Sequence, residues 1–401
     1  MKNNRIDYDI AKVMFGYWIM VILWQTFRPV ANRSLVDTFV KVALFGIVLL
    51  YSIKHRNTKH SNNITVIFAV YLITQVITIF CDSITNGVVI TTIFMMIQIV
   101  VFLIWLHNEE ISKATLEWFA KGVIIVAIVM GAYSIIYKTG RFIRAYTSIG
   151  AYGSECRSFL YSNHEYALYL ATAIMFTVWL QFSKRIEWKS FVLLISFLAI
   201  NLISAFSRTA IMGCIIAVSL LAFAAGKEYF SRLVVTGCSV FFISMASGKI
   251  RNFILNKILK GSIEKAGSIV DEGRSAMYQS EWWYFKEGSL LEKLFGHGYA
   301  GNQAGGHDAY LVILNTGGVI MFIFFMTLVI FCLKKSWICM QNDKMIGSLC
   351  LGLQMLVLLY MVAQTPIIFY STMDSFFITV LFVMIPFYTS NYLANGMEKE
   401  V

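Results

Sequence analysis

The sequence predicts an all-α membrane protein that crosses a lipid bilayer many times. Of its 401 residues, 58% are hydrophobic, only 14% are charged and three are prolines. The mean hydropathy of +0.69 is higher than that of a soluble fold. Because no strand pattern of alternating hydrophobicity appears, the backbone in lipid must satisfy its hydrogen bonds within helices.

The number of expected spans follows from the length of the apolar runs, at about 20 residues per spanning helix. About twelve transmembrane helices are expected within a single membrane domain, residues 1–401. They are placed at 12–28, 35–53, 63–81, 87–106, 119–137, 164–182, 187–206, 209–225, 231–247, 310–333, 345–366 and 372–390. The first run is interpreted as a retained span, because no small-residue cleavage site follows it.

Lys and Arg residues in the short loops predict the orientation of the chain, since cytoplasmic loops are enriched in both. With the amino terminus inside, most of them fall on the cytoplasmic side. Twelve spans then place both termini in the cytoplasm. Two long connections, 138–163 and 248–309, lie on the outer face, and the second separates the ninth span from the tenth.

A second set of cations occupies these outer connections, where the orientation rule does not require them. Attraction to lipid headgroups is one explanation, and an anionic ligand is the other. Arg208 in SAFSRTAI is a sharper case, because it lies in a short turn between two apolar helices. An Arg at such a boundary pairs with a partner, binds a ligand or extends to the interface.

Several short motifs follow one another on the predicted outer face. They are Ser207-Arg208, Gly273-Arg274, Gly296-His297-Gly298, His307-Asp308-Ala309-Tyr310-Leu311 and Gly317-Gly318. Their order resembles that of the O-antigen ligase and polymerase superfamily, and the match spans about 204–330. Members of that family often have Asn where this chain has Asp308, and Trp where it has Tyr278.

The resemblance implies a GT-C-like membrane fold whose long outer loop, 248–309, is catalytic. It also implies glycosyl transfer from a polyprenyl-diphosphate-linked glycan donor to a glycan acceptor, outside the bacterial cytoplasmic (inner) membrane. No metal, cofactor or nucleic acid is implied, whereas membrane lipids and a polysaccharide chain-length regulator are partners. A polymerase of capsule or O-antigen repeat units is the first reading. A ligase for finished glycan and a flippase or exporter of lipid-linked sugars are the alternatives.

Candidate roles follow from the chemistry that this reaction needs. Arg208 and Arg274 would neutralise the departing diphosphate, because the planar guanidinium binds phosphate oxygens through two hydrogen bonds. His307 would accept the proton of the attacking hydroxyl, and Asp308 would orient His307 or act as the base itself. The remaining candidates for substrate contact are Arg141, Arg144, Arg157, His164, Tyr278, Trp282 and Tyr310.

Overall fold

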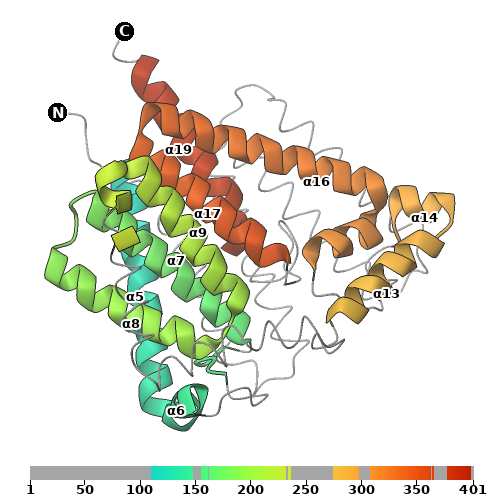
Figure 1. Ribbon diagram of the computed structural model, residues 1–401. Helices are drawn as coiled ribbons and strands as arrows, with labels where there is room; N and C mark the ends of the chain where they lie inside the picture. The colour runs from blue at the N-terminus through green and yellow to red at the C-terminus, as the bar shows by residue number, and fades with distance from the viewer. Residues whose placement is uncertain are drawn as a thin grey trace, which may run out of the picture. The chain divides into compact units, whose positions relative to one another are not determined.

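The computed structural model of the chain describes residues 110–147, 155–160, 162–231, 234–235, 274–297, 308–362, 364 and 377–398 (Figure 1). Within these ranges the regular structure is helical and no strand occurs, as the sequence predicts. The first four expected spans, and most of the one at 231–247, lie outside the described residues. The count of twelve therefore stays a prediction.

Six of the described helices are long and apolar enough to cross a membrane. They are Lys113–Tyr137 (α5), Trp188–Ala205 (α8), Arg208–Ala225 (α9), Ala309–Asn342 (α16), Lys344–Val362 (α17) and the helix Phe377–Ala394. Each corresponds to one expected span. The chain is therefore a membrane-embedded helical protein.

The helix α7, Asn163–Phe182, forms where a span was expected at 164–182. It does not belong to the six candidate spans. Every side chain from Glu165 to Leu180 is buried by other parts of the protein. A helix that is enclosed on all sides lies in the core of a bundle.

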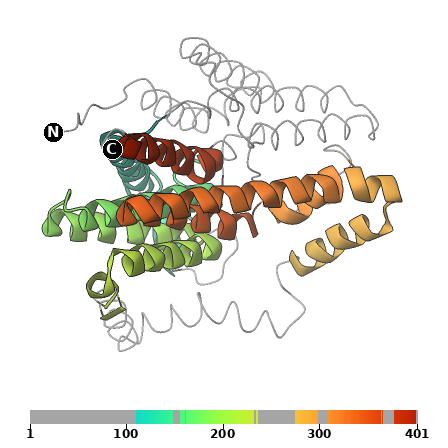
Figure 2. The ribbon, with the colours of Figure 1, turned by 90° about the horizontal axis from the view of Figure 1, so that it is seen from above.

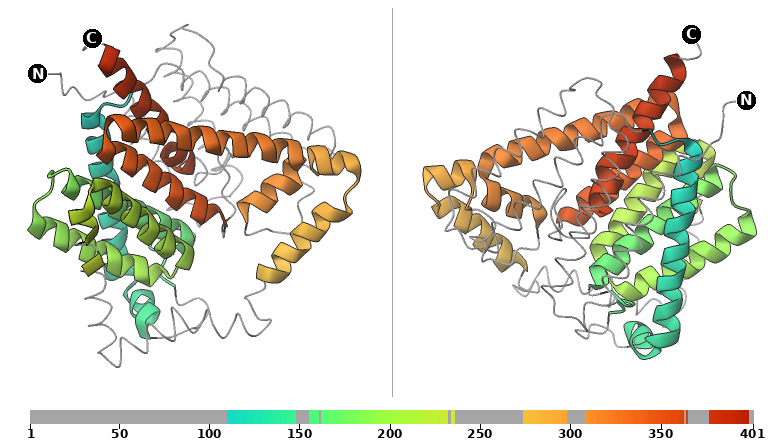
Figure 3. Two further views of the ribbon diagram at one scale, coloured as in Figure 1. Left: turned by 45° about the horizontal axis from the view of Figure 1, so that its top comes forward. Right: turned by 180° about the vertical axis from the view of Figure 1, so that it is seen from behind.

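The chain divides into two compact units, and α7 belongs to the unit formed by residues 117–273 and 340–360. In this unit α7 contacts both α8 and α9 (Figures 2 and 3). A series of buried hydrogen bonds connects α5 to α8 through α7. The Tyr166 hydroxyl donates to Asn201 Oδ1 at 2.9 Å and lies 3.1 Å from Ser134 Oγ. Hydrogen bonds of this kind hold helices together where lipid supplies no hydrophobic driving force.

Small residues let the helices of this unit approach one another closely. A Cβ on Gly213 would lie 2.9 Å from Leu356 of α17, and one on Gly352 would lie 2.6 Å from Met175 of α7. A Cβ on Gly131 would lie 2.7 Å from the Phe197 ring of α8. Close contacts at small residues are typical of membrane helices.

The connection at 138–163 was expected as an outer loop, and part of it is helical. Thr139–Thr147 forms the helix α6, which contacts α8. The Tyr146 hydroxyl donates to the Ile200 carbonyl oxygen. This contact between a phenol and the α8 backbone orders a segment that hydropathy alone assigns to a connection.

The second unit consists of residues 1–116, 274–339 and 361–401. The connection at 248–309 contributes two helices to it, α13 (Arg274–Glu287) and α14 (Leu290–Phe295). The next described helix, α16, extends nine residues beyond the expected end of its span at 333. Residues 334–342 contain neither Gly nor Pro, and the chain breaks only at Asp343, whose carboxylate accepts the backbone N–H groups of Met345 and Ile346 as the cap of α17.

The last helix contains a wide turn that accommodates a proline. Residues Val380–Met384 form a π-helical turn, and α19 continues from Ile385 to Glu398. Pro386 has no N–H to donate and its ring crowds the preceding turn, so a local π turn relieves the conflict. Figure 2 shows α19 beside the second half of α16, where the rings of Phe331 and Phe387 stack at 5.5 Å.

Candidate functional site

The motif Ser207-Arg208 lies in a tight turn between α8 and α9. The turn is closed by Phe206, which ends α8 with a left-handed backbone (φ 60°), and by Ser207, whose extended backbone starts α9. A non-glycine residue in the left-handed region is uncommon and is held there by its surroundings. The surroundings here come from the start of α7 and the segment before it.

Three contacts fix this turn. The backbone N–H of Cys156 donates to the Ser204 carbonyl at 3.0 Å, and Asn163 Nδ2 donates to the Ala205 carbonyl at 2.9 Å. These bonds satisfy two carbonyls at the end of α8 that have no partner within the helix. The third contact joins His164 Nδ1 to Ser207 Oγ at 3.1 Å. We call residues 204–208, together with Cys156, Asn163 and His164, the Arg208 turn.

The Arg208 turn carries groups of both charges, since Glu165 is buried in the first turn of α7. Helices α7 and α9 both start at this turn. The backbone N–H groups at the start of a helix carry partial positive charge. Arg208 is the first residue of α9 and its side chain is exposed. Arg157 follows Cys156 directly. The structure thus brings His164 to Ser207, the residue before Arg208, with Arg157 in the adjoining segment.

Arg141 and Arg144 are exposed on α6. Among the described residues, no contact joins either of them to the Arg208 turn. Their predicted role in substrate contact therefore stays a prediction.

The other predicted motifs belong to the second unit. Arg274 is the first residue of α13, and only its backbone is described. His307 lies outside the described residues. Asp308 precedes α16, where its Oδ1 accepts the backbone N–H of Tyr310 at 2.8 Å and that of Leu311 at 3.3 Å. Asp308 is therefore the amino-terminal cap of α16.

The aromatic candidates on α13 have different environments. The Tyr278 hydroxyl donates to the Val362 carbonyl at the end of α17, at 3.4 Å. Trp282 is 54% exposed and its ring lies 5.8 Å from that of Phe285. Tyr310 is partly buried, with its ring 5.9 Å from Phe325. Of the three, Trp282 offers the most open surface for stacking on a sugar.

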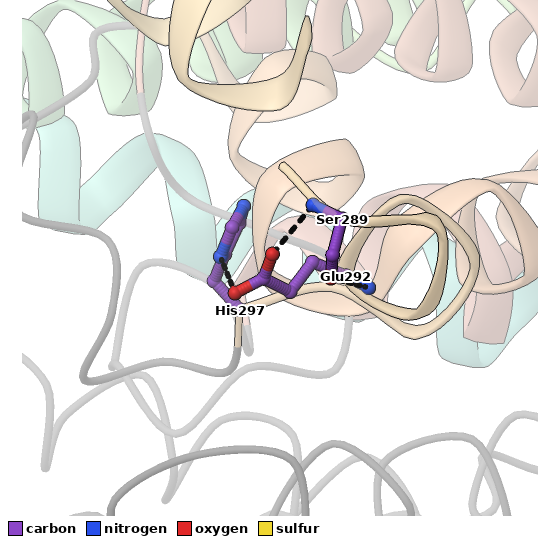
Figure 4. Close-up of polar contacts among 3 residues, drawn as sticks. All are labelled: Ser289, Glu292 and His297. Atoms are coloured by element: carbon purple, nitrogen blue, oxygen red, sulfur yellow. Dashed lines mark hydrogen bonds and ion pairs between the residues drawn. The ribbon is translucent and has the colours of Figure 1, made fainter. Parts of the chain in front are cut away.

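His297 anchors the end of α14 to α16. Ser289 and Glu292 form a reciprocal capping box at the start of α14 (Figure 4). Glu292 Oε1 then lies 3.4 Å from His297 Nδ1, and the His297 ring packs on Tyr284 with the centroids 4.3 Å apart. Hydrogen bonds from Ser289 hold the pKa of the exposed Glu292 carboxyl below its usual value. The His297 backbone N–H donates to the Asn315 carbonyl at 2.7 Å. These contacts give His297 a structural role, since they attach the end of α14 to α16.

The two glycine motifs of this region contact each other. A Cβ on Gly296 would lie 2.2 Å from the Thr316 carbonyl oxygen, and one on Gly318 would lie 2.3 Å from the Leu294 carbonyl. Gly318 also has a positive φ of 68° and produces the kink inside α16. The backbone after α14 therefore fits into the kink of α16 only because no side chain occupies these positions.

Replacement of Gly318 by Ala is expected to destabilise the protein by about 2–6 kcal/mol. Left-handed strain contributes about 1–3 kcal/mol and overpacking against Leu294 about 1–3 kcal/mol. Thermal unfolding of the purified protein in detergent measures the loss. Gly140→Ala is the matched control, because a Cβ at that α6 position meets nothing within 4 Å. An unchanged melting temperature for Gly318→Ala would contradict the close approach.

Sequence reasoning missed Glu281, which lies in the middle of α13. Its side chain is completely buried, and neither carboxylate oxygen has a hydrogen-bond partner. Burial, with a smaller repulsion from Asp308, raises the pKa of Glu281 to about 7. Burial also raises the pKa of Asp308 above its usual value, although its bonds from Tyr310 and Leu311 oppose this. The sequence offered one clue to Glu281, which was its position two helical turns after Arg274, within the segment that carries the motifs.

Comparisons with known proteins add no relative, since neither a protein-family model nor a curated protein matches the chain. Among the described residues, no group of three or more His, Cys, Asp or Glu side chains is placed to bind a metal ion.

Proposed function

We propose that the chain is a glycosyltransferase that joins polyprenyl-diphosphate-linked repeat units into O-antigen or capsular polysaccharide, on the outer face of the bacterial cytoplasmic membrane. The Arg208 turn is the observation that carries the proposal. It joins an exposed guanidinium, an imidazole and two helix amino termini at one end of a membrane-embedded bundle. Such an arrangement suits a diphosphate.

The proposed reaction needs neutralisation of the charge on the leaving diphosphate more than it needs a second carboxylic acid as a proton donor. Attack at an anomeric carbon passes through an oxocarbenium-like state, and negative charge grows on the departing diphosphate. Fixed guanidinium groups stabilise that charge as it develops. Arg208 would supply one of them, and Arg274 at the start of α13 would supply another.

The acceptor hydroxyl is a poor nucleophile and must lose its proton as the new bond forms. His307 would accept this proton as a neutral imidazole. Asp308 is engaged by the α16 backbone, which favours an orienting role for it. Trp282, being exposed on α13, would contact the glycan acceptor.

The test is incubation of the purified protein in lipid vesicles with lipid-linked repeat units alone. A ladder of lengthening chains is the expected result and identifies a polymerase. Product that forms only after a separate lipid or protein acceptor is added identifies a ligase. Movement of the intact lipid-linked sugar across the bilayer without a new glycosidic bond identifies an exporter and rejects the enzymatic proposal.

A further inference from the structure

Buried polar atoms without partners gather where α13 meets α16. Both carboxylate oxygens of Glu281 are buried and accept no hydrogen bond. Asn315 of α16 directs its Nδ2 to the Glu281 carbonyl at 3.1 Å, while its own Oδ1 is buried and has no hydrogen-bond partner. An unmatched buried acceptor costs about 1–3 kcal/mol, so three at one contact are unfavourable unless a donor is present.

A proton on Glu281 supplies that donor. A neutral carboxyl has one O–H, and Asn315 Oδ1 is an unmatched acceptor on the neighbouring helix. An ionised Glu281 would instead be a buried charge, and among the described residues no cation forms an ion pair with it.

We infer that Glu281 is a positioning residue whose protonated side chain docks α13 on α16, and that loss of its proton releases α13 together with Arg274. The inference rests on the proposed function in one respect, which is that α13 takes part in glycosyl transfer. Arg274 is the first residue of α13, so a change in the docking of this helix moves the backbone that carries the proposed diphosphate ligand.

Among the residues that the structure describes, the titratable groups beside this part of α13 lie at the start of α16 and after α14. Asp308 at the start of α16 repels a second negative charge. His297, after α14, contacts Glu292 and Tyr284, and its backbone N–H donates to the Asn315 carbonyl. The Asp308 carboxylate and burial therefore both oppose ionisation of Glu281.

The sign of the pH dependence follows from linkage. The pKa of Glu281 is raised from 4.5 to about 7 in the docked state. A raised folded-state pKa gives docking that is fully present below about pH 4.5 and is lost as the pH rises towards and through about 7. The opening of α13 should therefore increase about 10- to 100-fold between pH 5.0 and pH 8.0.

Hydrogen–deuterium exchange of the full-length protein in lipid nanodiscs tests this without substrate. Amides in 276–287 of the wild type should open more readily at pH 8.0 than at pH 5.0, after correction for intrinsic exchange. Glu281→Gln carries a neutral group of the same shape and should keep α13 protected at both pH values. Equal behaviour of the two proteins at both pH values would overturn the inference.

Asp308→Asn is a second variant that keeps the cap of α16, since Asn caps helices as well as Asp does. It removes the repelling charge, so the pH dependence of exchange in 276–287 should become smaller. An unchanged dependence would assign the raised pKa of Glu281 to burial alone and would leave the docking by Glu281 in place.

Activity assays separate this inference from the proposed function. If both hold, the ratio of the Glu281→Gln rate to the wild-type rate rises between pH 5.0 and pH 8.0. If exchange follows the expectation while no variant forms glycan, the docking switch stands and the proposed function fails.

Discussion

Replacing Arg208 by Lys is expected to lower the rate of glycosyl transfer about 100-fold, while the amount of folded protein stays near that of the wild type. Lys keeps the charge but loses the planar fork that binds two phosphate oxygens at once. Removal of one preorganised donor from a developing anion costs about 10²–10³ in rate. The rate of polymer formation from lipid-linked repeat units measures the loss.

Arg185→Lys is the matched control. Its Nε lies 2.9 Å from Glu117 Oε1, in a pair whose Arg side chain is half exposed. Surface pairs of this kind contribute about 0–1 kcal/mol, so this variant should keep wild-type stability and activity. Full activity of Arg208→Lys would remove Arg208 from the diphosphate site.

Replacing His307 by Ala is expected to lower transfer by about 10²–10⁴, the contribution typical of a general base. Binding of the polyprenyl-diphosphate donor should persist, because His307 is assigned to the acceptor hydroxyl. A binding assay with the lipid-linked donor, run beside the transfer assay, measures both.

His55→Ala is a suitable control, because His55 lies between the expected spans 35–53 and 63–81, in a connection that the predicted orientation assigns to the cytoplasmic side. Its rate should equal that of the wild type. Loss of donor binding in His307→Ala would make His307 a substrate ligand, and unimpaired transfer would remove it from the reaction.

Hydropathy predicted the helical class and the positions of the described spans, because an apolar run long enough to cross a bilayer must form a helix there. α8 and α9 lie within two residues of their expected ranges. α16 continues nine residues past the expected end of the span at 333, because hydropathy falls at Lys334 and Lys335 whereas no Gly or Pro interrupts the helix before Asn342. Composition cannot separate the end of a span from the end of a helix.

The site was predictable as a set of residue types but not as a set of contacts. The turn chemistry of SAFSRTAI singled out Arg208, whereas the hydrogen bond between His164 and Ser207, the residue before Arg208, joins residues 43 positions apart. The meeting of Gly296 with Thr316, and the burial of Glu281 against Asn315, depend likewise on how α13, α14 and α16 pack. Only the folded chain determines such pairings.

The enclosure of α7 has a consequence for biogenesis. A segment that leaves the translocon enters lipid according to its own apolarity, yet α7 begins with Asn163, His164 and Glu165 and finally contacts protein along its whole central length. It should therefore remain at the insertion machinery until α8, α9 and α17, which all pack on it, have been synthesised. Ribosome stalling before α17 should leave α7 accessible to crosslinking there, whereas release of the complete chain should not.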